Sequence, residues 1–263
     1  MSDIVLLSTG LHNLEACIQV ASVHHLGIEL MPFALPNVLN GDYEGTVRHV
    51  KTLLSNHRGP LTMHGPFIDM APGSPDEAFK RITLERSLRA IDTAQELGVG
   101  MVVFHANFIA MMRNPEYRRS WHQHSLKFWE PVAQYAADHQ VRLVIENMWE
   151  FDPSIIGDLL RDLEHPSLRA CLDVGHSQLF SDYSLEEWLE VLSPYLIHSH
   201  MNNNGGEMDY HRSLSDGVLD YHAILARFRQ LPSPPSMTLE MDTLDDMLAS
   251  LPYFQIAKQD AVL

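Results

Sequence analysis

The chain of 263 residues contains only two cysteines, Cys17 and Cys171. Two thiols are too few for the disulfide framework that stabilises small secreted domains, so we expect a reducing, cytoplasmic location. No apolar run approaches the roughly 18 residues of a membrane-spanning helix. The first residues, Met1-Ser2-Asp3, lead directly into a predicted strand rather than into a signal peptide. We therefore expect no partnership with a membrane.

Basic residues are also scarce. The chain has 18 lysines and arginines against 34 aspartates and glutamates, which gives a net charge of −16 at pH 7. Basic side chains that contact phosphates supply most non-specific affinity for nucleic acid, so this deficit argues against a nucleic-acid partner. Bound divalent cations would cancel several carboxylates locally, which keeps that alternative open. Histidine, the commonest metal ligand, occurs 16 times.

The apolar residues, 45% of the chain, gather in eight short runs that alternate with segments of helical periodicity. These runs read as continuous rather than alternating apolar segments, as expected of strands that are buried on both faces. We expect strands at residues 4–7, 27–31, 61–64, 101–105, 141–147, 168–174, 195–201 and 237–241. Eight such units in a chain of this length predict one closed (β/α)8 barrel, a single domain of residues 1–263 without a linker.

Helix start and stop signals place helices between these strands. Asn13 and Ser184 each precede a helix and belong to residue types that are good N-caps. A long loop with Arg113, Arg118 and Arg119 is expected before a helix that ends near residue 139. The other helices are expected at residues 14–25, 44–56, 76–97, 153–163, 184–192, 220–231 and 244–258.

The stretch 197–211, which reads IHSHMNNNGGEMDYH, indicates the chemistry most directly. His200 lies at the end of a predicted strand. Asp209 and His211 follow in a loop, one residue apart, so their side chains can point the same way if that segment is extended. Imidazole nitrogens and a carboxylate oxygen that converge in this way are suitable ligands for a zinc-like cation.

Other predicted strands end in similar residues. In a (β/α)8 barrel the carboxyl ends of the strands meet at one mouth. Each such residue has an ordinary explanation by itself: a core histidine, an ion pair between Glu146 and Arg142, or a turn capped by Asp173. Polar groups at buried strand ends nevertheless cost stability unless they are paired or bind metal, so their accumulation favours a common cause, a metal site. The nine predicted ligands are His64, His105, Glu146, Asp173, His176, His200, Asp209, His211 and Glu240.

The composition of this set limits the metal. Nitrogen and oxygen ligands without thiolate suit zinc, manganese, iron or cobalt. Four carboxylates and five imidazoles exceed the needs of one tetrahedral ion, so either two or three ions bind or some of these residues contact substrate. Cys171 precedes Asp173 by two residues and therefore shares its face of the strand. We expect Cys171 to pack inside the barrel rather than to bind metal.

Several short motifs carry a resemblance to a known family. They are His64-Gly-Pro, Phe104-His105, Ile145-Glu146-Asn147, Cys171-Leu-Asp173-Val-Gly-His176, His200-Met-Asn, Asp209-Tyr-His211 and Leu239-Glu240. With these motifs the chain resembles, over nearly its whole length, the xylose isomerase-like TIM barrel superfamily. That superfamily contains sugar isomerases and epimerases as well as endonuclease IV, the family 2 AP endonucleases.

The resemblance implies a different use of the ligands in each branch. In the endonuclease branch the nine matching positions hold three zinc ions. In the isomerase and epimerase branch Glu146, Asp173, His200 and Glu240 match the four ligands of a single Mn, Co, Mg or Zn ion. There the two glutamates also serve as acid and base, and the position of His176 contacts the substrate.

The sequence departs from the endonuclease pattern in several places. It has His105-Ala106-Asn107 where those enzymes have His-Pro-Gly, and His200-Met201-Asn202-Asn203 where they have His-Leu-Asn-Asp. Ser215-Asp216-Gly217 replaces their Gly-Glu-Gly, and Phe67 replaces a tyrosine that helps to hold bent DNA. Together with the shortage of basic residues, these departures favour the isomerase branch.

We therefore predict a metal-dependent isomerase or epimerase of a sugar or sugar phosphate, with one to three zinc or manganese ions. The catalytic residues would be Glu146, Glu240 and His176. The predicted substrate contacts are Phe67, Asn107, Arg113, Arg118, Arg119 and Arg212; the arginines are candidates for holding a phosphate, with ordinary solvated surface as the alternative. The competing prediction is a phosphoester hydrolase similar to endonuclease IV. A non-catalytic binding barrel is a third alternative, and a homo-oligomer is compatible with each.

Overall fold

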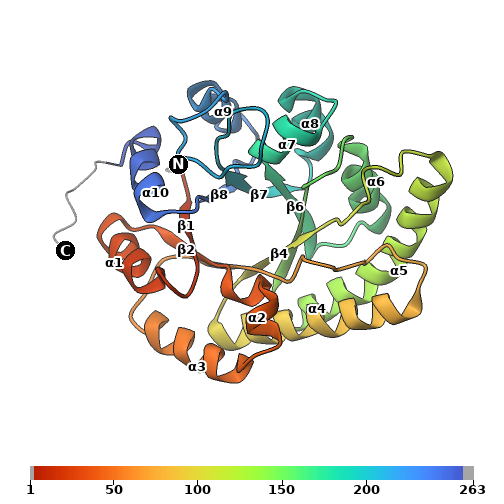
Figure 1. Cartoon of the computed structure of the whole chain (residues 1–263), viewed down its shortest axis with the longest axis horizontal. Helices are drawn as coiled ribbons and strands as arrows, with labels where there is room; N and C mark the ends of the chain where they lie inside the picture. Colours follow the sequence, from red (N-terminus) through yellow and green to blue (C-terminus); the bar gives the residue numbers. More distant parts are fainter. Residues whose placement is uncertain (1–2, 257–263) are drawn as a thin grey trace.

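The computed structural model describes residues 3–256 of the chain. Its eight parallel strands close into a barrel in sequence order, with β1 paired to β8 (Figure 1). This confirms the predicted (β/α)8 barrel. The strands are β1 (Val5–Thr9), β2 (Gly27–Leu30), β3 (Leu61–His64), β4 (Met101–His105), β5 (Arg142–Glu146), β6 (Leu168–Asp173), β7 (Leu196–Met201) and β8 (Ser236–Leu239).

The helices surround the barrel as an outer ring (Figure 1). In the described residues they are α1 (Leu14–His24), α2 (Pro36–Leu39), α3 (Tyr43–Leu54), α4 (Glu77–Leu97), α5 (Pro115–Asp138), α6 (Ser154–Leu163), α7 (Val174–Phe180), α8 (Leu185–Leu192), α9 (Tyr221–Phe228) and α10 (Leu244–Ser250), with two 3-10 helices, η1 (Pro32–Ala34) and η2 (Leu251–Phe254). None of these helices is both long enough and apolar enough to cross a bilayer.

The apolar core has two parts. The larger part lies between the strands and the helices and contains the fully buried Trp121, Trp129 and Trp188. The smaller part lies inside the barrel and consists of Met101, Val103, Val144 and Cys171. Because residues two apart on a strand share a face, these side chains lie below the strand-end residues of β4, β5 and β6. Cys171 packs inside the barrel, as predicted; that it does not bind metal stays a prediction.

Several predicted boundaries differ from the structure, among them two next to predicted site residues. The strand predicted at residues 168–174 ends at Asp173, and α7 begins at the next residue, so His176 lies in the first turn of a helix. The Asp173 carboxylate accepts a hydrogen bond from the His176 backbone N–H at 2.6 Å and thereby caps this helix. Arg118 and Arg119 lie on α5 rather than in a loop, because that helix already begins at Pro115.

The other helix ends follow their local chemistry. Ser184 forms the predicted cap of α8, in a reciprocal capping box with Glu187. Asn13 precedes α1, but its side chain accepts from the Gly10 backbone N–H rather than capping the helix. The helix predicted to reach residue 258 ends at Ser250 and continues as η2, where Pro252 has no N–H to donate; residues 257 and 258 lie outside the described part.

Candidate metal centre at the barrel mouth

The nine predicted ligands come together at the carboxyl end of the barrel, where the strand-end residues point inward. They form three groups whose ligand atoms lie within 4.8 Å of one another, and Glu146 belongs to two of the groups. The first group is His64, His105 and Glu146; the second is Glu146, Asp173, His200 and Glu240; the third is His176, Asp209 and His211. All members of the first two groups are buried.

The first group presents two imidazole nitrogens to one carboxylate oxygen. The Nε2 atoms of His64 and His105 are 3.1 Å apart, and Oε2 of Glu146 lies 3.3 Å and 3.1 Å from them. Nδ1 of His64 is 2.8 Å from the Gly65 carbonyl oxygen, which can only accept, so Nδ1 carries the proton. In its neutral form His64 therefore directs the lone pair of Nε2 towards Glu146, as a metal ligand would.

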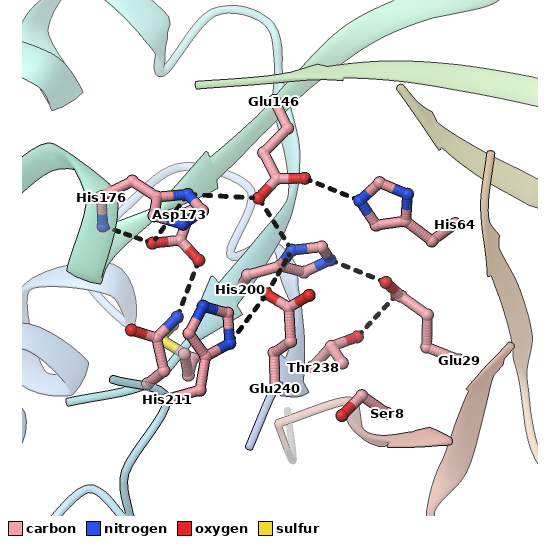
Figure 2. Close-up of polar contacts among 12 residues, drawn as sticks. Ser8, Glu29, His64, Glu146, Asp173, His176, His200, His211, Thr238 and Glu240 are labelled. Atoms are coloured by element: carbon pink, nitrogen blue, oxygen red, sulfur yellow. Dashed lines mark hydrogen bonds and ion pairs between the residues drawn. The ribbon is translucent and has the colours of Figure 1, made fainter. Parts of the chain in front are cut away.

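The second group is arranged around His200 (Figure 2). Its Nδ1 lies 3.0 Å from Oε1 of Glu146 and 3.0 Å from Oε2 of Glu240. Oε2 of Glu146 and Oε2 of Glu240 are buried, and the groups that approach them among residues 3–256 are the imidazole nitrogens of the site itself. Buried carboxylates are costly unless a positive charge neutralises them, which protonated imidazoles or a metal cation can supply. This donor set therefore fits a divalent metal ion.

The third group lies at the more open side of the mouth. Asp209 is partly exposed and bridges two imidazoles, with Oδ2 at 3.2 Å from Nε2 of His176 and Oδ1 at 3.4 Å from Nε2 of His211. Nδ1 of His176 is 3.1 Å from the carbonyl oxygen of Asn147, which again leaves Nε2 for a ligand. Residues 209 and 211 do point the same way, as their spacing predicted.

Protons on the histidines balance the charge of the carboxylates. Burial acts to lower the pKa of His176, but the Asp173 and Asp209 carboxylates outweigh it and raise that pKa to about 10. Burial also opposes the charge of His211, yet Asp209 and Glu240 raise its pKa to about 9. For Glu240, the charge and hydrogen bond of His200 overcome burial and lower the pKa to about 2. The ionised carboxylates of the site thus stabilise positive charge between them, whether on protonated imidazoles or on a cation.

A fully buried carboxylate, Glu29, lies inside the barrel beneath this site and was not predicted. Its Oε1 is 2.8 Å from Nε2 of His200 (Figure 2). Its Oε2 is 2.9 Å from Nε2 of His198 and accepts hydrogen bonds from Thr62 Oγ1 at 2.6 Å and Thr238 Oγ1 at 2.8 Å. Every oxygen of this carboxylate is therefore satisfied, as a buried charge requires.

Glu29 determines which nitrogen of His200 faces the site. Burial acts to raise the pKa of Glu29, but His200 and His198 outweigh it and hold that pKa well below its usual range. An ionised carboxylate only accepts, so Nε2 of His200 carries a proton and the neutral ring offers Nδ1 to the side of Glu146 and Glu240. The available sequence signal was a glutamate within an otherwise apolar strand, which must have a partner.

Two further residues fix the loops around the ligands. The Asn147 side chain donates to the Asp173 carbonyl oxygen at 3.0 Å and accepts from the Asp173 N–H at 2.9 Å, which joins the ends of β5 and β6. Glu150 is buried, and its carboxylate accepts from the N–H of Met148 at 2.7 Å and of Phe108 at 3.0 Å. It thereby joins the loops that follow β4 and β5.

The predicted substrate contacts Phe67 and Asn107 lie beside the ligands. The Phe67 ring stacks on the His105 imidazole, with ring centroids 4.6 Å apart and an interplanar angle of 26°. The Asn107 side chain donates to the Phe67 carbonyl oxygen at 3.0 Å. Asn107 has a φ of 54°, a left-handed conformation that asparagine tolerates better than most residues. Their contact with substrate remains a prediction.

Most of the predicted arginines have partners of their own. Arg113 forms an ion pair of 2.5 Å with Asp182, and Arg212 lies 3.6 Å from Asp216. Arg118 pairs with Asp152 at 2.7 Å. Arg118 and Arg119 line a depression between α5 and α6, on the outer ring of helices rather than at the mouth.

A cavity of about 490 Å³ borders the metal centre. It adjoins His211 and Glu240, and its walls are formed by residues at the ends of β1, β2 and β8 and in the loops that follow them.

Known structures have the same fold. The TTHB071 protein from Thermus thermophilus, from a crystal soaked with zinc chloride, is 28% identical with a TM-score of 0.80, over 95% of this chain and 96% of that one. A D-tagatose 3-epimerase-like protein is 20% identical with a TM-score of 0.80, over 96% and 97%.

Sequence comparison identifies a relative and a family. The uncharacterized protein MJ1311 of Methanocaldococcus jannaschii is 22% identical over 211 residues, which are 78% of this chain and 72% of the relative. A family model described as xylose isomerase-like TIM barrel matches residues 20–256. Because this match spans nearly the whole barrel, the protein belongs to the xylose isomerase-like TIM barrel family.

Proposed function

We propose that the protein is a metal-dependent isomerase or epimerase of a sugar. The observation that carries this proposal is the placement of Glu146 and Glu240, which approach Nδ1 of His200 from two sides at 3.0 Å each. Together with Asp173 they form one buried group of four nitrogen and oxygen donors. The likeness to a D-tagatose 3-epimerase-like protein supports a sugar as substrate, and the zinc-soaked relative supports a divalent metal.

In this proposal Glu146, Asp173, His200 and Glu240 would hold the principal ion. When bound, the ion supplies Lewis acidity, which polarises a substrate carbonyl and acidifies the hydrogen on the neighbouring carbon. Glu29 keeps Nε2 of His200 protonated and so reserves Nδ1 for this role. The third group, His176, Asp209 and His211, together with His64 and His105, would hold further ions or orient substrate hydroxyls.

The two glutamates would transfer the proton. Glu146 ends β5, whereas Glu240 follows β8, so the carboxylates reach the mouth from different sides of the barrel. The low pKa of Glu240, about 2 in the metal-free protein, means that its carboxylate is ionised at neutral pH, the form in which it could accept a proton. One glutamate removes the proton, and the electron pair moves onto the carbonyl oxygen. The other glutamate, after taking up a proton from water, delivers it to the opposite face of that carbon while the electron pair returns from oxygen, which inverts the carbon; the first glutamate then releases its proton to water.

Deuterium exchange tests this proposal even when the product is not identified. Metal-loaded protein is incubated in D2O with a panel of ketopentoses and ketohexoses, and carbon-bound deuterium is measured by NMR. We expect exchange into at least one sugar and its loss, by at least about a hundredfold, in Glu146→Gln and in Glu240→Gln. Circular dichroism and metal content of each variant serve as controls. Absence of exchange across the panel, or full activity in either variant, would count against the proposal.

One observation favours a second candidate, a phosphoester hydrolase similar to endonuclease IV. All nine predicted ligands assemble into three groups, enough donors for three ions. Clustered ions can activate water and stabilise a leaving oxygen. Incision of an abasic duplex, with loss of incision in His176→Ala, distinguishes this candidate from the isomerase.

A further inference from the structure

A second cavity lies beside the metal centre, on the side away from the cavity next to Glu240. It has a volume of about 870 Å³ and is formed by the loops after β3, β4 and β5 and by the end of α7. Cavities that bind small molecules typically have volumes of roughly 300–1,000 Å³. Its walls are mainly apolar and include Ile68, Met70, Ile109, Met111, Trp149 and Phe180. We refer to it below as the apolar pocket.

The apolar pocket lies next to the residues of the metal centre. Phe67 forms part of its wall and also stacks on the imidazole of His105. Met148 follows Glu146 by two residues in the β5 loop. The Phe180 ring lies 6.0 Å from the His176 ring, at the far end of α7. The wall of this pocket therefore lies against the side chains of His105 and His176, so a molecule that extends past them from the metal centre would reach it.

Several apolar side chains of the pocket face solvent. Met111 is 95% exposed, Ile109 54% and Trp149 45%. Large side chains of this kind, gathered around a cavity, indicate a surface that is covered by a ligand. The volume of the pocket and its position against the ligand residues favour a small molecule rather than a protein chain as that ligand.

The pocket lacks a charge suited to phosphate. Among the described residues that line it, only Asp69 and Arg113 are charged. The Arg113 guanidinium is held by Asp182 at 2.5 Å and lies 4.1 Å from the centre of the Phe151 ring. The Arg113 charge is thus already paired with a carboxylate, so the pocket favours apolar ligand groups over phosphate.

We propose that the apolar pocket binds an apolar part of the substrate, so that a sugar-like hydroxyketone joined to an aryl or alkyl group is a better substrate than a free sugar, which is still turned over. This inference rests on the proposed isomerase or epimerase function. The polar carbons would lie at Glu146 and Glu240, and the apolar group would cover Ile109, Met111 and Trp149. Burying a phenyl group in such a pocket strengthens binding by about tenfold or more.

Tryptophan fluorescence provides a direct measurement. Trp121, Trp129 and Trp188 are buried, so Trp149 is the reporter that a ligand in the pocket can reach. Phenyl and methyl β-D-glucopyranosides, and the corresponding galactosides, are titrated into zinc-loaded protein. We expect each phenyl glycoside to bind at least about tenfold more tightly than its methyl partner.

Two variants and a matched control test whether the preference for phenyl glycosides arises in the apolar pocket. Ile109→Asp and Met111→Asp each place a charge on an exposed position of the pocket, so folding is retained. We expect both to reduce the phenyl preference to about twofold or less. Val23→Ser removes an apolar side chain that is 58% exposed on α1, outside the pocket, and is expected to keep the preference.

The outcomes separate this inference from the proposed function. Equal binding of phenyl and methyl glycosides, or a preference that Ile109→Asp leaves intact, overturns the pocket assignment even if deuterium exchange into free ketoses is observed. A clear phenyl preference without exchange into any sugar keeps the apolar pocket and overturns the isomerase chemistry. Sedimentation of the wild type and of Ile109→Asp tests self-association. If the wild type is a dimer, the variant is a monomer, and phenyl and methyl glycosides bind equally, the exposed apolar surface is assigned to contact with a second copy of the chain instead.

Discussion

The His200 side chain connects two layers of carboxylates in the barrel. Glu29 contacts its Nε2 from the β2 side of the barrel, and Glu146 and Glu240 contact its Nδ1 from the mouth (Figure 2). A ring with carboxylates at both nitrogens has one orientation, and when it gives up the proton on Nδ1 to bind metal, Glu29 keeps the other proton on Nε2. The geometry of the proposed metal ligand therefore depends on a residue that would not itself touch the metal.

Glu29→Gln tests this positioning role. A glutamine amide carries no charge and presents two donors, so it cannot accept from His200, His198 and both threonines as Glu29 does. We expect the zinc affinity to fall by about 10- to 100-fold. Competition with a chromophoric chelator measures this affinity on the folded fraction. The spectrum of bound cobalt(II) adds a readout of ligand geometry that a purely structural role would not alter.

Matched substitutions control this experiment. Glu190→Gln removes a carboxylate that is exposed on α8 and is expected to leave zinc affinity unchanged. Glu29→Asp retains the charge and is expected to recover part of the affinity. Wild-type zinc affinity and an unchanged cobalt spectrum in Glu29→Gln would show that Glu29 has no influence on the ligand.

Zinc binding is expected to release protons. The pKa of His176 is raised to about 10 and that of His211 to about 9, so both imidazoles are charged at pH 7.5 before zinc binds. A ligand nitrogen must lose its proton before it binds zinc, so apparent affinity rises as pH approaches these values, by about tenfold per pH unit for each displaced proton. Calorimetry in buffers of different ionisation enthalpy counts the released protons. Binding with no release at pH 7.5 would contradict a ligand role for these two histidines and for His200, whose pKa Glu146 and Glu240 raise well above its usual value against the effect of burial.

Sequence patterns predicted the strand-end residues but not the buried network beneath them. His64, His105 and His200 end apolar runs, and parallel strands present their carboxyl ends at one mouth, so their convergence could be predicted. Glu29 lies inside a predicted strand with apolar residues on both sides of it. The residues that Glu29 contacts depend on the register between neighbouring strands. That register is a property of the closed barrel and is not encoded in one segment.

At the level of the elements, the loops around the mouth are held by side chains that cap or cross-link them. Asp173 caps α7 and Asn147 joins β5 to β6, while Glu150 joins the β4 and β5 loops. These hydrogen bonds explain why α7 begins directly after β6. They also place His176, through the first turn of α7, next to Asp209.

Glu150→Gln tests the connection between the two loops. Both oxygens of Glu150 accept backbone N–H groups, so the amide nitrogen of glutamine would face a donor and leave one buried N–H without a partner. We expect unfolding in urea to show a loss of about 1–3 kcal/mol. Glu190→Gln, at an exposed position of α8, should change stability by less than about 0.5 kcal/mol. An equal effect of the two substitutions would mean that Glu150 does not stabilise the loops.

Element boundaries were less predictable than element type. The eight strands could be recognised because each is a continuous apolar run. The early start of α5 was missed although Asn114-Pro115 is a typical beginning of a helix: the Asn114 side chain accepts from the Tyr117 N–H at 2.8 Å, and proline is favoured in the first turn. The strand predicted to extend to residue 174 was too long because the Asp173 cap competes with further strand pairing.

At the level of the whole molecule, charge is as informative as fold. The closed barrel is shared by isomerases and nucleases of this superfamily, so the fold does not choose between the two proposed reactions. The net charge of −16 favours the proposed isomerase, because a duplex requires basic contacts and a neutral sugar does not. Arg113, Arg118 and Arg212 are already paired with aspartates, so they add little positive potential to the surface.

We expect the protein not to incise abasic DNA at a useful rate, even when its site is fully loaded with metal. A duplex presents about one negative charge per 1.7 Å of axis, and a binder usually answers it with several lysine or arginine contacts. Three divalent ions would add about six positive charges, all inside the mouth, and would leave the net charge strongly negative. The flanking phosphates would therefore be repelled and association slowed.

Incubation of zinc-loaded protein with an abasic duplex at low salt, where electrostatic attraction would be strongest, measures the rate of incision. Specific incision that is abolished by His176→Ala, with metal content and circular dichroism retained, would make the hydrolase the better interpretation of the nine ligands.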